Sequence, residues 1–472
     1  MHITLFILLS IFLPVSVHAE AIFDGTMNPE TKGQKLSGDF IVKQSDGSLV
    51  GDNLFHSFSH FSINSDESAT FYSSNQIKNI ISRVTGTDLS RINGGLRSFI
   101  NGSKATPSPA NFYLLNPNGV IFGSNAQLDI GGSFYVLTCD YISMEDGQTF
   151  DLHSEFPVLS MTSPHSFGFL DKSAGSIEIN GGENNLELKV EKNQRISLIA
   201  NGVNIQKSFI EALSGQIYIA SISGACEVVH SPNGYENMDT IGRGPISIKN
   251  NSELYVSGYD YGDASGDIFI MGGHVLFSDS VIEARTEGKQ NGGITIIDGT
   301  SITLDNQAFI LSDNISHPSD PSSSAIYYGG NVLIRSTGGV VFSDSSKIET
   351  GASASNNFRD PYCYAGSVTI DANSISFVEF SKINSHSDNA GKAGDFHLIA
   401  QKDILFSDSN LYSEIIAYNH DTTNNIPKTK ISINAQNISF LNKAGIASQT
   451  TNYGDGGDIY LNAQKNIYMD SG

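Results

Sequence analysis

A repeated set of three short apolar stretches constrains the fold of this chain more than any other feature. From about residue 244, a unit recurs in which a glycine and a polar residue precede alternating apolar residues, followed by two further apolar stretches after short polar turns. One unit comprises Gly266-Asp-Ile-Phe-Ile270, Val275-Leu-Phe277 and Val281-Ile-Glu-Ala284. We expect the units to begin at Gly266, Gly292, Gly330, Gly366, Gly394, Thr429 and Gly457.

Three strands in a unit of roughly 20 to 40 residues are typical of a β-solenoid. The sequence therefore predicts an all-β fold, a right-handed parallel β-helix with three short strands per coil. Alternate strand residues would point inward and stack about 4.8 Å apart. The predicted inner ladder comprises Ile270, Ile296, Ile334, Ile370 and Leu398. An array of sandwich domains would instead show strands every ~8 to 12 residues without this triplet phase.

Less regular coils are expected between residues 150 and 244. The long linkers Ser312 to Tyr328 and Gly351 to Tyr364 should loop outward, because a coil cannot absorb them. The chain stops after the second strand of a coil, so we expect a member truncated at its C-terminus.

Charge and cysteine content exclude several classes of protein. The formal net charge is −22, from 49 acidic and 27 basic residues, which argues against binding to nucleic acid or to an anionic membrane surface. The cysteines Cys139, Cys226 and Cys363 are too few and too far apart for a disulfide framework. Alternation places Cys139 in line with Tyr135 and Leu137, so a buried thiol is expected there.

The N-terminus has the pattern of an export signal. Residues Ile3 to Leu13 form an apolar run that ends at Pro14, and Val17-His-Ala19 supplies small residues for a signal peptidase. The run is too short to span a membrane, which takes about 20 apolar residues. Residues 1–19 are therefore the expected signal peptide, with cleavage after Ala21 as the alternative.

A strand-turn-strand segment, Ala110 to Phe134, contains the strongest motif. Pro117 fixes φ in a turn, Asn118 tolerates bridge or left-handed geometry, and Gly119 closes the turn. Together with Asn53 to Ile63 and Ile80 to Gly86, this segment resembles the secretion domain of filamentous-haemagglutinin-type exoproteins, the secreted partners of bacterial two-partner secretion. Some members carry an earlier Asn-Pro-Asn motif, which is missing here.

The resemblance divides the chain into a two-partner secretion domain, residues 20–150, and β-solenoid repeats, residues 151–472. It implies a secreted or cell-surface, adhesin-like or haemagglutinin-like protein of the Gram-negative outer membrane. We expect no cofactor. Export would follow the general secretory (Sec) route and then an outer-membrane β-barrel partner with periplasmic domains. The resemblance assigns Asn116, Pro117, Asn118 and Gly119 to transporter recognition, whereas local chemistry alone also allows a turn needed only for folding.

Three sets of residues suggest other chemistry. His56 and His60 have a spacing compatible with a metal pair, and Gly454-Asp-Gly-Gly-Asp458 resembles half of a calcium-binding repeat. We expect ordinary histidines and a turn, and no metal site. The enzymatic alternative is a secreted β-helix that degrades polysaccharides, with Asp279, Asp344 and Asp408 stacked on one face. Each aspartate lies in a Ser-Asp-Ser sequence, so turn capping is the preferred interpretation and no enzymatic activity is expected.

Overall fold

The structure is a computed structural model of the 472-residue chain. It describes residues 20–103, 105–170, 174–231, 234–236, 242–258, 263–287, 290–316, 327–354, 363–388, 392–416, 428–451 and 456–470. The expected signal peptide lies outside these residues, as do most of the two long linkers. Within the described ranges, no helix has the length and apolar character needed to cross a membrane.

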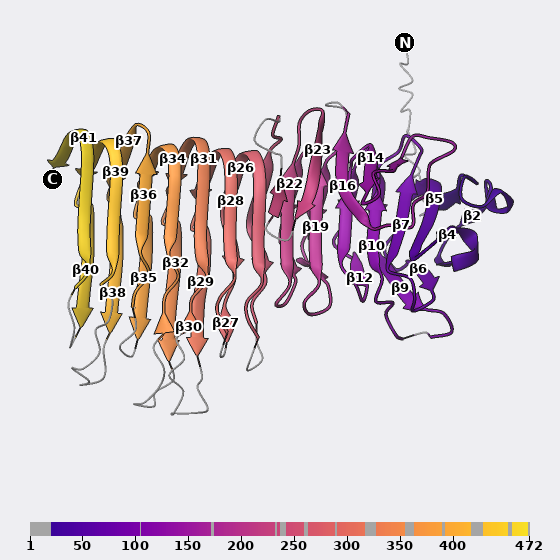
Figure 1. Ribbon diagram of the computed structural model, residues 1–472, viewed down its shortest axis with the longest axis horizontal. Helices are drawn as coiled ribbons and strands as arrows, with labels where there is room; N and C mark the ends of the chain where they lie inside the picture. Colours follow the sequence, from indigo (N-terminus) through magenta and orange to yellow (C-terminus); the bar gives the residue numbers. More distant parts are fainter. Residues whose placement is uncertain are drawn as a thin grey trace, which may run out of the picture.

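A long parallel sheet runs the length of the molecule, with β5 near one end and β41 at the other (Figure 1). Its first face stacks the opening strand of each coil in the order of the chain. These strands are β5 (Asn53–Phe61), β7 (Asn79–Val84), β10 (Asn111–Leu115), β13 (Phe134–Leu137), β19 (Arg195–Ala200), β22 (Gln216–Ser221), β26 (Asp267–Glu283), β28 (Ile294–Asp305), β31 (Asn331–Phe342), β34 (Val368–Phe377), β36 (Phe396–Ala400), β39 (Lys430–Leu441) and β41 (Asp458–Asp470). At about 4.8 Å per step the stack is about 60 Å long.

Two further faces complete each coil. The second face contains the later parts of the long strands of the first face, together with β8 (Ser90–Ile92), β11 (Val120–Phe122), β17 (Ile177–Asn180), β20 (Val203–Gln206), β25 (Ile246–Tyr255) and β37 (Asp403–Ser407). The third face contains β3 (Asp39–Val42), β6 (Ser68–Ser73), β9 (Gly95–Ile100), β12 (Gln127–Asp129), β18 (Leu186–Lys189), β21 (Ser208–Glu211), β27 (Thr286–Glu287), β29 (Phe309–Ser316), β32 (Lys347–Ala354), β35 (Lys382–Asp388), β38 (Asn410–Ile416) and β40 (Gly445–Thr451). A small pair, β30 (Tyr327–Tyr328) and β33 (Cys363–Tyr364), lies beside it. The predicted all-β, parallel β-helical fold is therefore confirmed.

The inner ladder is confirmed with one correction. Ile270 pairs with Ile297, and Ile297 pairs with Ile334, so Ile296 lies on the opposite face of the strand. The unit begins at Gly293 and not at Gly292, because a Cβ on Gly293 would lie 2.1 Å from the carbonyl oxygen of Gly266 in the preceding coil. The doubled glycine shifted the expected phase by one residue, and a shift of one reverses every side chain.

Besides the apolar inner ladder, polar side chains form a column of their own at the start of the first-face strands. Asn79 donates to Asn53 Oδ1 at 2.8 Å, and Asn111 donates to Asn79 Oδ1 at 3.1 Å. The column continues through Ser133, Arg195, Gln216 and Asp267. These bonds satisfy buried polar groups at the corners and join successive coils in register.

The N-terminal strands pair antiparallel at the edge of the first coil. The three-strand repeat did not predict these antiparallel strands. Strands β1 (Ala21–Phe23) and β4 (Ser48–Val50) pair antiparallel with β5, and β2 (Lys35–Leu36) pairs with β1. Two 3-10 turns, η1 (Pro29–Thr31) and η2 (Gln44–Asp46), lie between them. The antiparallel strands cover an edge that would otherwise be open to another chain.

A separate antiparallel sheet extends from the helix. It consists of β14 (Tyr141–Met144), β15 (Thr149–Asp151), β16 (Pro164–Phe169), β23 (Cys226–Ser231) and β24 (Gly234–Glu236). A second hydrophobic core lies between this sheet and the outward side of the first face. In β10, Phe112 and Leu114 therefore point into the helix core, while Tyr113 and Leu115 point into the second core.

Candidate functional site: the Asn116–Gly119 corner

The corner between β10 and β11 is a tight turn. The backbone N–H of Gly119 donates to the carbonyl oxygen of Asn116 at 3.0 Å, which closes the turn around Pro117 and Asn118. Gly119 has φ +117°, a conformation that favours glycine, and a Cβ there would lie 2.9 Å from the Ser176 carbonyl oxygen. Gly119 therefore takes the left-handed geometry at this turn, while Asn118 has no positive φ.

Asn116 is fully buried and connects the corner to the preceding coil. Its Nδ2 donates to the backbone oxygen of Asp88 and to Ser90 Oγ, both at 3.0 Å. Its Oδ1 accepts from the backbone N–H of Asn118 at 2.9 Å and from Asn118 Nδ2 at 3.1 Å. This amide uses both its donor and acceptor capacity within the protein, so it holds the corner in one conformation.

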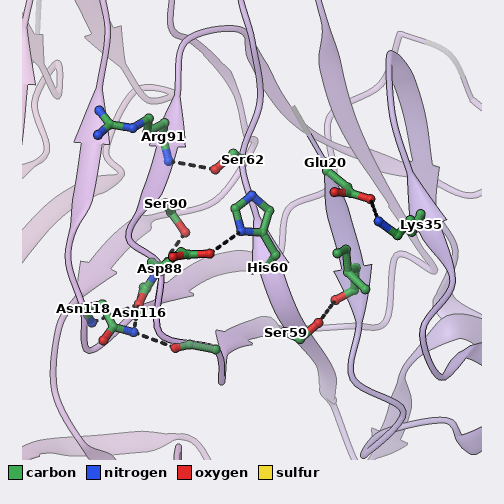
Figure 2. Close-up of polar contacts among 12 residues, drawn as sticks. Glu20, Lys35, Ser59, His60, Ser62, Asp88, Ser90, Arg91, Asn116 and Asn118 are labelled. Carbon is green, nitrogen blue, oxygen red and sulfur yellow. Dashed lines mark hydrogen bonds and ion pairs between the residues drawn. The ribbon is translucent and has the colours of Figure 1, made fainter. Parts of the chain in front are cut away.

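Asn118 is exposed, and it lies beside Asn116 in the same corner (Figure 2). Its Nδ2 also donates to the Gly86 carbonyl oxygen at 2.7 Å. Pro117 is half-buried, and its carbonyl oxygen accepts from the Gly175 N–H of the following coil at 2.6 Å. The structure thus brings all four motif residues together, with Pro117 and Asn118 toward solvent and Asn116 and Gly119 inside.

Neighbouring polar groups surround the corner in Figure 2. His60 Nδ1 lies 3.6 Å from Asp88 Oδ2, on the loop whose backbone binds Asn116. The backbone N–H of Arg91 donates to Ser62 Oγ at 3.1 Å. The side chains around the corner are therefore hydrogen-bonding amides and hydroxyls, with one imidazole and one carboxylate beside them.

The two histidines suggested as a metal pair point in different directions. His56 is fully buried beside the rings of Phe58 and Phe71, and burial lowers its pKa from 6.5 to about 3. Where β5 pairs with β1, the register shifts because β5 has one extra residue between Phe58 and His60. Phe58 and Phe61 therefore both face the core, and His60 faces outward. No group of three or more His, Cys, Asp or Glu side chains suited to a metal occurs among the residues with described positions.

A buried arginine near the corner was not anticipated. Arg83 is fully buried, its Nε donates to Ser57 Oγ at 2.8 Å, and one Nη donates to Thr26 Oγ1 at 3.0 Å. Ser57 in turn donates to Asp24. Burial by itself raises the pKa of Asp24, but hydrogen bonds from Ser57, Thr26 and Thr85 outweigh it, so the pKa lies below its ordinary value of 3.8. Nothing in the sequence around Arg83 indicates that this arginine is buried, because a single charged residue in an alternating strand is expected to face solvent.

The aspartates of the enzymatic alternative lie in turns. Asp279, Asp344 and Asp408 have φ between 48° and 51°, a left-handed geometry that short polar residues adopt in turns. Phe277 and Phe342 belong to one column, but Leu304 of the intervening coil separates them. Asp279 and Asp344 are therefore about two strand spacings, ~9.6 Å, apart. The calcium-like segment begins at Gly454, which lies outside the described residues.

The thiols occupy different environments. Cys139 is fully buried in the second core with Tyr135 and Leu137, as alternation predicted, and burial raises its pKa. Cys226 is half-buried on β23, and burial raises its pKa to about 11. Both are free and protonated at neutral pH, so neither is a nucleophile. The side chain of Cys363 lies outside the described atoms.

One protein family and one solved structure are similar to this chain. The TPS secretion domain family matches residues 19–241. Among solved structures, the chain is similar to the secretion domain of HMW1 from Haemophilus influenzae, with 15% identity and a TM-score of 0.42 over 96% of this chain and 98% of that chain. Comparison with curated proteins gives no match.

The matched residues contain the corner, the antiparallel strands at the first coil and all five strands of the separate antiparallel sheet β14–β16, β23 and β24, which we call the outer sheet. Proteins with this domain are secreted or cell-surface exoproteins of Gram-negative bacteria, and the domain implies an outer-membrane transporter as its partner. The chain therefore carries a TPS secretion domain, the domain of exoproteins of bacterial two-partner secretion, in residues 19–241.

Proposed function

We propose that this chain is an adhesin-like exoprotein whose Asn116–Gly119 corner is recognised by the periplasmic domains of its outer-membrane transporter. Residues 19–241, the TPS secretion domain, form the secretion-determining unit in this proposal, and the coils that follow it form the exported solenoid. The observation that supports it is the arrangement of the corner, in which buried Asn116 fixes the backbone and leaves Asn118 on the surface. A fixed polar turn can be recognised with little loss of conformational entropy.

The proposed route begins with Sec-dependent export and removal of residues 1–19. The periplasmic domains of the transporter bind the folded secretion domain, and the coils that follow it cross the outer membrane and fold outside. Each added coil buries residues of the inner column, such as Ile334, Ile370 and Leu398, and closes backbone hydrogen bonds to the coil before it. Burial of apolar surface supplies free energy that favours outward movement of the chain.

An adhesive role suits the solenoid better than a catalytic one. Asp279, Asp344 and Asp408 each occupy a left-handed turn position, where a short polar side chain caps the turn. The proposed protein is therefore not an enzyme and needs no cofactor. Incubation of the purified chain with polygalacturonate or hyaluronan should release no reducing ends above background. Release of oligosaccharides would support the polysaccharide-degrading alternative.

Secretion assays test the recognition proposal. Asn118→Ala in the full-length chain should reduce the amount in the culture supernatant when the transporter is present, while the melting temperature of the purified chain stays close to wild type. Asn125→Ala is the matched control, because Asn125 is also an exposed asparagine in a turn that contacts the preceding coil. This control should be secreted normally.

Three outcomes would contradict the proposal. Normal secretion of the Asn118→Ala chain would remove the corner as a recognition site. Normal secretion of the wild-type chain from cells that lack any two-partner transporter would contradict the export route itself. Equal loss of secretion and of refolding in Asn118→Ala would leave only a structural turn.

A further inference from the structure

The segment between β15 and β16 exposes three large apolar side chains. Phe156 is 88% exposed, Met161 is 70% exposed and Val158 is 53% exposed. They lie within six residues of one another in a segment without regular secondary structure. We call residues 154–161 the apolar loop. Apolar patches of a few hundred Å² on a protein surface are often functional sites.

Buried polar groups hold this loop in place. Asn53 Nδ2 donates to the backbone oxygens of Ser160 and Thr162, at 3.0 and 2.6 Å, and Asn53 is almost fully buried. One Nη of Arg83 donates to the Ser154 backbone oxygen at 3.0 Å. Both ends of the loop are therefore bonded to the first two coils, which means that its apolar side chains are presented by a defined backbone.

Close packing reinforces these bonds. Gly51 has φ +60°, and a Cβ there would lie 2.9 Å from Met161 Cβ, so the loop rests against the turn between β4 and β5. Leu159 points the other way and packs against the second core, while Ser160 is 3% exposed. The loop is thus not an unpacked part of the core. It has its own inward-facing residues, and the outward ones remain uncovered.

We propose that the apolar loop is a docking surface for the periplasmic part of the outer-membrane transporter. This inference rests on the proposed function. The loop lies within residues 19–241, the TPS secretion domain whose partner is a transporter. The loop and the corner are both bonded to one short segment of the chain, because Arg83 donates to the Ser154 backbone oxygen and the Gly86 carbonyl oxygen accepts from Asn118.

The size of the surface favours a transient partner over a second copy of the chain. An aromatic side chain buries about 150 to 250 Å². Phe156, Val158 and Met161 together therefore supply a few hundred Å² at most, below the ~800 Å² per partner of a stable interface. Small interfaces are typical of short-lived encounters. A transporter must release the chain that it exports, so a weak apolar contact suits it.

The test uses the full-length chain in the bacterium that produces it. A triple variant, Phe156→Ser with Val158→Thr and Met161→Gln, should lower the secreted amount at least about tenfold, as expected when central apolar contacts of an interface are lost. Its melting temperature should stay near wild type, because the three side chains are exposed. Phe380→Ser is the matched control, since Phe380 is 73% exposed on a solenoid turn and should leave secretion unchanged.

The possible outcomes separate the explanations. Normal secretion of the triple variant would overturn the docking proposal, and so would an equal loss with Phe380→Ser. A wild-type dimer in sedimentation that the triple variant loses, with secretion intact, would assign the loop to self-association instead. Failure of the proposed function is recognised independently, because the wild-type chain would then be secreted from cells without a transporter.

Discussion

Asn116 and Ser90 lie in neighbouring coils and are joined by a hydrogen bond of 3.0 Å from Asn116 Nδ2 to Ser90 Oγ. Both side chains are fully buried. The first asparagine of the motif is therefore part of the packing between coils, whereas Asn118, two residues later, is on the surface. This difference separates the effect of each residue on folding from its effect on recognition.

Asn116→Ala should lower the free energy of unfolding by about 2 to 3 kcal/mol, because the buried hydroxyl of Ser90 and the backbone oxygen of Asp88 lose their donor. Asn118→Ala should cost less than about 1 kcal/mol, since its hydrogen bonds are at the surface. Urea unfolding of the two purified variants measures the difference. Equal losses in both variants would contradict the division of roles.

His56 should make the protein less stable in acid. Its pKa is about 3 in the folded chain and 6.5 when exposed, so below pH 6.5 the unfolded state binds the extra proton. The free energy of unfolding should therefore fall by up to about 1.4 kcal/mol per pH unit between pH 6.5 and about 3. His56→Leu should remove this slope, and His60→Leu should keep it, because His60 is outside the core. Thermal unfolding across this range measures both, and an unchanged slope in His56→Leu would contradict the assignment.

Arg83→Met should destabilise the chain by on the order of 3 kcal/mol. The substitution leaves the Asp151 and Ser154 backbone oxygens without their donor and removes the positive charge near Asp24. Arg91→Met is the matched control on an exposed position of the next strand. Chemical denaturation compares the two. A loss in Arg83→Met no larger than that of Arg91→Met would show that the buried network contributes little.

Ile370→Asp should prevent stable packing of its coil, at a cost of several kcal/mol for an uncompensated buried carboxylate. Ile370 is fully buried between Ile334 and Leu398. Thr369→Asp is the control, because Thr369 is the adjacent residue and points to the opposite side of the strand. Circular dichroism during heating should show a lower melting temperature for Ile370→Asp alone. Matching melting curves would contradict the inward assignment.

The solenoid could be predicted from local patterns. Alternating apolar residues show which side of each strand faces inward, and the repeat of three strands shows which residues of successive coils are equivalent. Ile334, Ile370 and Leu398 were therefore assigned correctly to one column. Aspartates in Ser-Asp-Ser sequences favour left-handed turns for the same local reason, and Asp344 and Asp408 adopt them. The turn at Pro117 and Gly119 likewise depends only on the φ preferences of those residues.

Where the chain departs from the repeat, only the tertiary structure decided which side chains of a strand are buried. A doubled glycine moved Ile297 into the inner column in place of Ile296, and a register shift turned His60 outward. The outer sheet covers Tyr113, and Arg83 is buried by groups far away in sequence, such as Ser154. The physical reason is that alternation is local, with a period of two residues, whereas burial depends on contacts between segments whose pairing a local pattern does not encode.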